Sequence, residues 1–272
     1  MNGRHALIVV VALGAAGVLF AASRYSRDVT AHGEAPAGET LTLRFYRNPA
    51  PVAAFTTHDL DGRAVDTALF HGKVVLINFW ATWCGPCRAE IPDLVALQEK
   101  YRDQLQIIGV SEDEGSPEAV KRFAEEHRVN YPVVMTTDEI RRLFPGVSAL
   151  PTSFVLDRES RLVQKHVGML RKVTTEAETR ALAGLPVNAT IEEVDRAERL
   201  KLDAGAQVID IPGIELAKLT AAKRTEALQK LNAEACTCGC DLTVAKCRVD
   251  DPNCGVSLPL ARTIVKQIAD AR

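Results

Sequence analysis

The sequence predicts an α/β fold in which helices flank a mixed β-sheet. An unbroken apolar, β-branched run at 74–80 is typical of a central strand that is buried on both faces. A helical pattern over 88–100 follows it after a short turn. Further on, two apolar runs at 152–157 and 161–168 are joined by three polar residues and predict a β-hairpin. A strand–helix unit followed by an antiparallel pair indicates a sheet of mixed direction.

The other elements continue this alternation. Ser116 and Pro117 have the residue types of a helix cap and first turn, so they predict a helix start. A helix that includes 176–182 ends near Gly184. The remaining expected elements are a buried strand at 105–110, a short strand at 132–136 and a short helix at 138–144.

Composition places the chain among ordinary globular proteins. It has 272 residues, 47% of them hydrophobic and 25% charged, which excludes wholesale disorder. The formal net charge is −2, so there is no global basic field to attract nucleic acid, and we expect no nucleic-acid partner.

The first residues predict export from the cytoplasm. Ala6–Ala22 is an apolar run of 17 residues with arginines on both sides, at the short end of a membrane-spanning helix. We interpret 1–23 as an uncleaved single-pass anchor, with a cleaved secretory signal as the alternative. The polar stretch 24–48 is expected to be a linker. Both interpretations place the body of the chain in the periplasm or its extracytoplasmic equivalent, an oxidising compartment.

The seven cysteines fall into two groups that are separated by almost 150 residues. This distribution argues against one disulfide framework for the whole chain and indicates two separate cysteine chemistries. The odd total means that at least one sulfur is free, metal-bound or paired with another molecule. The first group is Cys84 and Cys87, and the second is Cys236, Cys238, Cys240, Cys247 and Cys254.

The first group predicts a redox dithiol. Cys84-Gly85-Pro86-Cys87 follows a buried strand and begins a helix, which is the setting of a redox Cys-x-x-Cys rather than of half a zinc site. Cys84 at the helix N-terminus is the expected nucleophile, because the helix dipole and free N–H groups stabilise its thiolate. Cys87, one turn later, is the expected resolving thiol, and Gly85 and Pro86 set the turn between them.

The segment Phe79–Pro92, which reads FWATWCGPCRAEIP, resembles the thioredoxin superfamily and, within it, the exported TlpA/ResA/CcmG branch. Asp59–Arg63 and Gly146–Phe154 support the resemblance, which covers 49–185. It implies a thioredoxin-like fold and a thiol-disulfide oxidoreductase whose dithiol needs no cofactor. A peroxidase is disfavoured, because the lone cysteine in a Pro/Thr/Cys setting that peroxiredoxins need is missing.

The resemblance also implies roles for residues around the dithiol. Cytoplasmic thioredoxins carry a buried Asp at the position of Asn78, whereas the TlpA-like branch has a helix glutamate that Glu90 matches. Such a carboxyl exchanges a proton with the resolving thiol; the alternative is an exposed carboxylate in the first turn. Pro151 matches a cis-proline that faces the dithiol and leaves the Leu150 backbone open to a substrate strand; an ordinary trans proline is the alternative. Trp83 is expected on the active-site surface, where it contacts substrate with Gly85, Pro86 and Leu150.

The resemblance further implies partners. A member of this branch is a reductant that a membrane electron donor keeps reduced. Its substrates are envelope proteins with disulfides, among them apocytochrome c.

Residues 186–272 predict an appended helical module. We expect an amphipathic helix at 191–202, a helix from Thr220 to Leu231 and a last helix at 260–269. The five cysteines of this tail are compatible with a Zn²⁺ or Cu⁺ site, with two disulfides and a free thiol, or with a second redox dithiol. A Zn²⁺ or Cu⁺ site would imply an alternative function, that of a metal-binding redox protein or metallochaperone. The tail is also weakly similar to CcmH-type cytochrome c maturation modules, although their Cys-x-x-Cys is absent.

Overall fold

The computed structural model describes residues 41–195 and 205–271, which belong to one compact unit that begins at Leu41. The expected anchor at 1–23 lies outside the described residues. Among the residues that are described, no helix has the length and apolar character needed to span a membrane.

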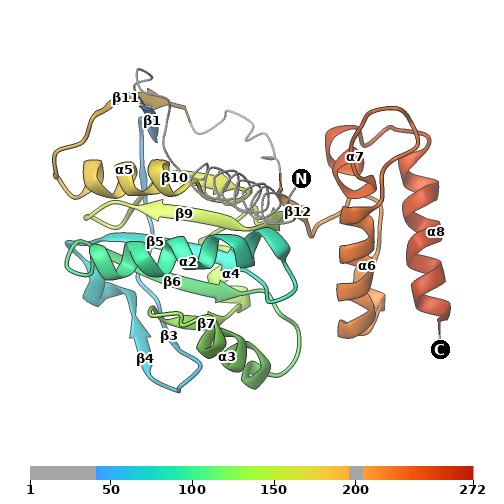
Figure 1. Ribbon diagram of the computed structural model, residues 1–272, viewed down its shortest axis with the longest axis horizontal. Coiled ribbons are helices and arrows are strands. Elements are labelled where there is room, and N and C mark those ends of the chain that lie inside the picture. The colour runs from blue at the N-terminus through green and yellow to red at the C-terminus, as the bar shows by residue number, and fades with distance from the viewer. Residues whose placement is uncertain (1–40, 196–204, 272) are drawn as a thin grey trace, which may run out of the picture. The chain divides into compact units, whose positions relative to one another are not determined.

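A six-stranded mixed sheet forms the centre of the fold (Figure 1). Its middle strand is fully buried, pairs in parallel with one neighbour and antiparallel with the other, and confirms the α/β fold expected from the sequence. The strand order is β2 (Ala50–Pro51), β10 (Arg161–Val167), β9 (Thr152–Leu156), β5 (Val74–Trp80), β6 (Leu105–Ser111) and β7 (Val133–Met135).

Two helices connect the parallel strands. Helix α2 (Gly85–Lys100) joins β5 to β6, and α3 (Pro117–Glu126) joins β6 to β7. Both connections step in the same direction across the sheet, so the right-handed crossover rule puts both helices on one face. Trp80 meets Phe123 of α3 with ring centroids 5.4 Å apart. Phe79, the next residue back along β5, has its side chain on the opposite face.

Aromatic rings fill that opposite face. Phe79 lies 6.1 Å from Phe144 and 5.7 Å from Phe154, between ring centroids in edge-on arrangements. Phe144 directly follows α4 (Asp138–Leu143). These fully buried rings belong to the core of the main body.

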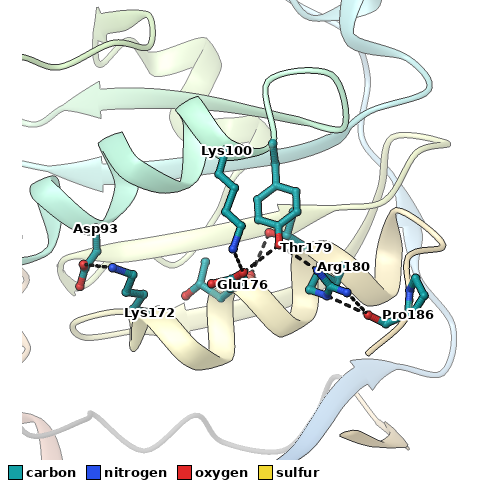
Figure 2. A network of polar contacts seen from close by, with 9 residues as sticks. Asp93, Lys100, Lys172, Glu176, Thr179, Arg180 and Pro186 are labelled. Atoms are coloured by element: carbon teal, nitrogen blue, oxygen red, sulfur yellow. Dashed lines mark hydrogen bonds and ion pairs between the residues drawn. The ribbon is translucent and has the colours of Figure 1, made fainter. Parts of the chain in front are cut away.

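Charged side chains fix α5 (Lys172–Leu182) beside α2, as Figure 2 shows. Lys100 Nζ lies 2.6 Å from Glu176 Oε1, and the Tyr101 hydroxyl donates to the same oxygen over 2.8 Å. Lys172 Nζ lies 3.4 Å from Asp93 Oδ1. The ion pairs are solvent-exposed and therefore add little to stability, but they define how α5 lies against α2.

Beyond the central sheet, a short hairpin of β3 (Thr56–His58) and β4 (Ala64–Asp66) leads into the 3₁₀ helix η1 (Thr67–Phe70). The Asp66 carboxylate caps η1 by accepting from the Ala68 N–H over 2.9 Å.

A two-stranded parallel ladder corrects two sequence expectations. β1 (Leu41–Tyr46) lies in the stretch that we expected to be a linker, and β11 (Ala189–Val194) lies where we expected a helix at 191–202. Leu43 and Phe45 alternate with exposed residues and are buried, which explains the strand. Each strand obtains its partner from about 150 residues away along the chain, so local periodicity does not reveal the pairing. The rest of the expected helix, 196–202, lies outside the described residues.

The tail folds around a small apolar core of its own. Its helices are α6 (Ala221–Ala233), α7 (Val244–Asp250) and α8 (Ser257–Asp270), with β12 (Gln207–Val208) and η2 (Leu216–Lys218) before them. Leu231, Val244 and Ile264 are buried at its centre. Thr220 caps α6, as expected, by accepting from the Lys223 N–H over 3.4 Å. Helix α7 was not expected, because its seven residues hold too few apolar positions to show a helical period in the sequence.

Candidate active site

The dithiol lies where β5 passes into α2. Cys84 is the N-cap of α2, and its sulfur accepts from the Cys87 N–H over 3.3 Å. Pro86 lies in the first turn, where its missing N–H costs no hydrogen bond. Cys84 and Cys87 form a disulfide, so the structure is the oxidised state. Both cysteines are fully buried.

Glu90 lies on α2, three residues after Cys87, and is 2% exposed. Its Oε1 accepts from Asn78 Nδ2 over 2.8 Å, and its Oε2 accepts from the Leu170 N–H over 2.8 Å. Burial raises the pKa of Glu90 to about 7, and the two hydrogen bonds moderate that rise because they favour the ionised form. The carboxyl is therefore not the exposed first-turn group of the alternative interpretation, and it changes protonation near neutral pH.

Asn78 connects Glu90 to the sheet. Its Nδ2 also donates to Ser153 Oγ over 2.9 Å, so one amide group bridges β5, α2 and β9. Asn78 is a visible departure from the buried Asp of thioredoxins, but its hydrogen-bond partners cannot be inferred from the sequence. Neither Ser153 nor Leu170 can be recognised from the sequence. Ser153 contributes a hydroxyl group two residues after Pro151, and Leu170 contributes only its backbone N–H.

The expected cis-proline is cis. The Leu150–Pro151 peptide bond has this geometry, and it follows β8 (Ala149–Leu150). Thr152 Oγ1 donates to the Ala149 carbonyl over 2.7 Å and holds the loop. The Leu150 backbone is not open as expected: β8 pairs antiparallel with β12 of the tail. This partner lies more than 50 residues later, beyond a change in composition, which is why the sequence did not reveal it.

The remaining expected contact residues surround the disulfide. Trp83 is half-buried and packs against both the core of the main body and the core of the tail. Gly85 is exposed and Pro86 is partly exposed. Trp80 is buried in the core, as expected for the end of a run at 74–80 that is buried on both faces.

Comparison with known proteins agrees with this site. Residues 47–165 match the model of the AhpC/TSA family. ResA, a thiol-disulfide oxidoreductase of Bacillus thuringiensis subsp. konkukian, is 36% identical over 124 residues, which are 45% of this chain and 70% of the relative. The thioredoxin-like protein YneN of Bacillus subtilis is 34% identical over 124 residues, 45% of this chain and 72% of that protein. The chain belongs to the ResA-like thiol-disulfide oxidoreductases. Its fold is accordingly thioredoxin-like.

Solved structures of related oxidoreductases are also similar to part of this chain. A thioredoxin-family thiol:disulfide interchange protein from Chlorobium tepidum is 31% identical, with a TM-score of 0.48, and the match covers 50% of this chain and 98% of that one. A DsbF homologue from Corynebacterium diphtheriae is 26% identical, with a TM-score of 0.45, and its match covers 57% and 98%.

The tail lies beyond the family match and adds a cysteine cluster to the ResA-like body. The sulfurs of Cys236, Cys238, Cys247 and Cys254 all lie within 4.8 Å of one another. A cluster of this size can hold a metal ion. Cys240 is exposed, and its sulfur lies 3.0 Å from that of Cys238 but outside the group of four.

Local backbone contacts assemble this cluster. The Cys236 N–H donates to the Leu242 carbonyl over 2.8 Å, which closes the Cys-x-Cys-x-Cys loop. Cys247 is buried on α7, and Cys254 precedes α8. The Ser257 N–H donates to the Cys254 sulfur over 3.4 Å, and hydrogen bonds from Ser257 lower the pKa of this thiol to about 6. Cys254 thus favours the thiolate form that binds metals, whereas hydrogen bonding with Cys240 and Cys236 raises the pKa of Cys238 to about 12.

Proposed function

We propose that this chain is a membrane-anchored reductant of protein disulfides in the cell envelope. The observation that carries the proposal is the Cys84–Cys87 pair at the start of α2, with the buried Glu90 one turn further along the helix. The names of the ResA relatives support the class of reaction. The apolar run at 6–22 supports the anchor and the extracytoplasmic location of the body.

The reaction is a two-step exchange between sulfurs. In the reduced protein the Cys84 thiolate attacks one sulfur of a substrate disulfide, which forms a mixed disulfide and releases the other substrate sulfur as a thiolate. Glu90 accepts the Cys87 proton, and the Cys87 thiolate attacks the Cys84 sulfur. The second substrate sulfur leaves as a thiolate and takes up the proton that Glu90 accepted, and the protein is left with the Cys84–Cys87 disulfide.

A membrane electron donor completes the cycle. It supplies two electrons and two protons to reduce the Cys84–Cys87 disulfide. We propose apocytochrome c as one substrate class, because reduced cysteines are needed before a haem is attached to them.

The reduction potential of the full chain tests this direction of electron flow. Equilibration with defined dithiol/disulfide buffers, followed by alkylation and mass spectrometry of the Cys84 peptide, gives the potential of this pair. A reductant requires a value well below about −120 mV, the potential of a strong oxidant, and a value near that number would overturn the proposal. Cys87→Ser is expected to trap the substrate as a mixed disulfide, whereas Cys84→Ser is expected to trap none.

The location has its own test. The full-length chain is expected to sediment with membranes and to resist extraction by high salt, with its body digested by protease added from the periplasmic side. Recovery in the soluble fraction would contradict the anchor and leave the redox chemistry untouched.

We further propose that the tail binds Zn²⁺ or Cu⁺. Four thiolates at about 2.3 Å from a central Zn²⁺ have sulfurs about 3.8 Å apart. The sulfurs of Cys236 and Cys238 lie 3.3 Å apart, those of Cys238 and Cys247 lie 3.8 Å apart, and all four lie within 4.8 Å of one another, so the observed distances bracket this spacing. Purification of the full chain under reducing conditions, followed by elemental analysis, is the test. One metal ion per chain would support the site. A metal-free protein whose tail cysteines form disulfides would contradict it.

A further inference from the structure

The tail segment Gly205–Asp210 lies along the loop that contains Pro151. Gln207 is opposite Leu150 and Val208 is opposite Ala149 in the antiparallel pair of β12 and β8. The Ile209 N–H continues the pairing by donating to the Ser148 carbonyl over 2.9 Å. One further step of the register brings Ala206 opposite Pro151. The backbone edge that an extended substrate would use is therefore already paired.

The same segment also passes the start of α2. A Cβ placed on Gly205 would lie 4.0 Å from the Cβ of Pro86, which is ordinary van der Waals contact. The segment thus extends from the Cys84–Cys87 motif to the Pro151 loop. Exchange requires direct contact between a sulfur of the dithiol and the incoming group. Because Cys84 is 0% exposed, that contact needs the covering part of the chain to move.

The backbone of the segment also forms hydrogen bonds on the side that faces away from β8. The Val208 N–H donates to Asn232 Oδ1 over 2.7 Å, and Asn232 Nδ2 donates to the Val208 carbonyl over 2.8 Å. The side chain of Asn232 on α6 thus makes the same pair of bonds that a neighbouring strand would make. An ion pair between Arg224 of α6 and Glu114 also ties the tail to the main body.

The residues of the segment distinguish it from a substrate. It reads Gly-Ala-Gln-Val-Ile-Asp and contains no cysteine, so it offers no sulfur for exchange. The side chain of Val208 is fully buried, and Ala206 packs against Ala149 and Val167. The segment therefore has the extended backbone and apolar side chains of a bound peptide without the reacting group.

We propose that Gly205–Asp210 is a built-in pseudosubstrate that occupies the peptide groove of the dithiol and covers Cys84. The partner that fits this groove is a protein that offers an extended, largely apolar strand next to its disulfide, because such a strand replaces both the pairing with β8 and the contact with Pro86. Small thiols and disulfides lack the strand and are excluded. The inference rests on the proposed function only in naming this partner.

The first experiment measures how fast a small reductant reaches the disulfide. The oxidised full chain is mixed with tris(2-carboxyethyl)phosphine, and reduction of the Cys84–Cys87 pair is followed by alkylation and peptide mass spectrometry. Asn232→Ala removes both bonds to Val208, and loss of about two hydrogen bonds is expected to raise the population of the open form and the reduction rate about tenfold. Gln229→Ala, at an exposed position of the same helix, is the matched control and is expected to keep the wild-type rate. Equal reduction rates in the wild type and in Asn232→Ala would contradict the proposal that this segment covers Cys84.

A second experiment tests the position of the segment without depending on its stability. In a Cys87→Ser background, Ala206→Cys places a thiol in the segment at the register position opposite Pro151. Treatment with diamide is expected to join position 206 to Cys84, and peptide mapping separates this bond from any bond to the tail cysteines. Ala222→Cys, exposed on α6, is the control and is expected not to cross-link to Cys84. Failure of position 206 to cross-link while Cys84 remains alkylatable would overturn the proposal.

Neither measurement uses a protein substrate. A failed cross-link therefore leaves the oxidoreductase proposal intact. Conversely, an oxidising potential for Cys84–Cys87 would leave the pseudosubstrate proposal standing and would change only the direction of the exchange.

Discussion

The side-chain amide of Asn78 donates to Oε1 of Glu90 over 2.8 Å and so joins the strand before the dithiol to the helix after it. The bond fixes the orientation of a carboxyl that is buried and has a pKa of about 7. A group that changes protonation near neutral pH is suited to accept and return the proton of the resolving thiol.

Glu90→Gln is expected to slow the release of the mixed disulfide at pH 8 by roughly 10²-fold, the usual size of a general-base contribution. In the wild type this rate rises with pH through about 7 as Glu90 ionises, and in the variant that inflection disappears. Stopped-flow measurement of the second step between pH 5.5 and 8.5 checks both points. Glu99→Gln, exposed on the same helix, is the control, and a variant that retains the inflection would exclude Glu90 as the proton acceptor.

The same pKa predicts how stability depends on pH. Burial raises the pKa of Glu90 from 4.5 to about 7, so between these values the folded protein holds a proton that the unfolded chain has released. The contribution of Glu90 to the free energy of unfolding is therefore complete below pH 4.5 and falls as the pH rises to about 7, by about 3 kcal/mol. Urea unfolding of the oxidised protein at several pH values is the measurement. Glu90→Gln is expected to flatten this fall, and parallel curves for the variant and the wild type would contradict the assignment.

Asn78→Asp is expected to move the pH inflection of the release step upward by about one pH unit or more. The substitution places a second carboxyl within hydrogen-bond distance of Glu90, and two buried carboxyls in contact share one proton, so the second ionisation is disfavoured. Ser153→Ala separates this effect from loss of the other Asn78 partner and is expected to leave the inflection near 7. A profile for Asn78→Asp that coincides with that of the wild type would show that Glu90 does not control the step.

Sequence was sufficient for the parts of this protein whose determinants are local. The run at 74–80 gives β5, and the motif after it gives both the helix start and the dithiol, because strand burial and helix capping depend on adjacent residues. The resemblance to the TlpA/ResA/CcmG branch identified Glu90 as a site residue and predicted the cis form of the Leu150–Pro151 peptide bond. These features are also the ones that the family match covers.

Features that depend on distant pairing were missed. Leu41–Tyr46 becomes a strand because β11 offers it an edge, and Leu150 is covered because β12 offers it another. Gln207 and Val208 carry no local signal, since a two-residue strand has no measurable period. The donor to Glu90 Oε2 is the backbone of Leu170, which any residue except proline would supply.

Cys247→Ser is expected to weaken Zn²⁺ binding by the full chain at least tenfold, whereas Cys240→Ser is expected to leave it nearly unchanged. Cys247 belongs to the group of four sulfurs, and Cys240 lies outside it. Loss of one thiolate from a four-coordinate site removes a metal bond that water replaces poorly. Competition with a chromophoric chelator under reducing conditions measures both affinities. Equal losses in the two variants would assign Cys240 to the ligand set.

Arg248→Met is expected to destabilise the tail by about 2–4 kcal/mol, because it removes the hydrogen bonds that a buried guanidinium donates to two backbone carbonyl groups. Arg248 is 3% exposed, and its guanidinium donates to the Pro212 carbonyl through two nitrogens at 3.1 Å and to the Pro252 carbonyl at 2.8 Å. It therefore ties the loop after Gly205–Asp210 to the end of α7. Arg248→Lys is expected to fall between Met and the wild type, because one ammonium group cannot reproduce the planar fork.

Hydrogen exchange resolved by peptide distinguishes this local effect from general instability. In Arg248→Met the amides of 205–213 are expected to exchange faster, while those of β5 keep their protection because they belong to the separate core of the main body. Arg262→Met, at an exposed position of α8, serves as the control. If Arg248→Met and Arg262→Met unfold at the same denaturant concentration, the buried guanidinium does not hold the tail together. If 205–213 loosens in Arg248→Met alone, the loop that Arg248 holds and the segment that covers Cys84 open together, and the Cys84–Cys87 disulfide of that variant is then expected to be reduced faster than that of the wild type.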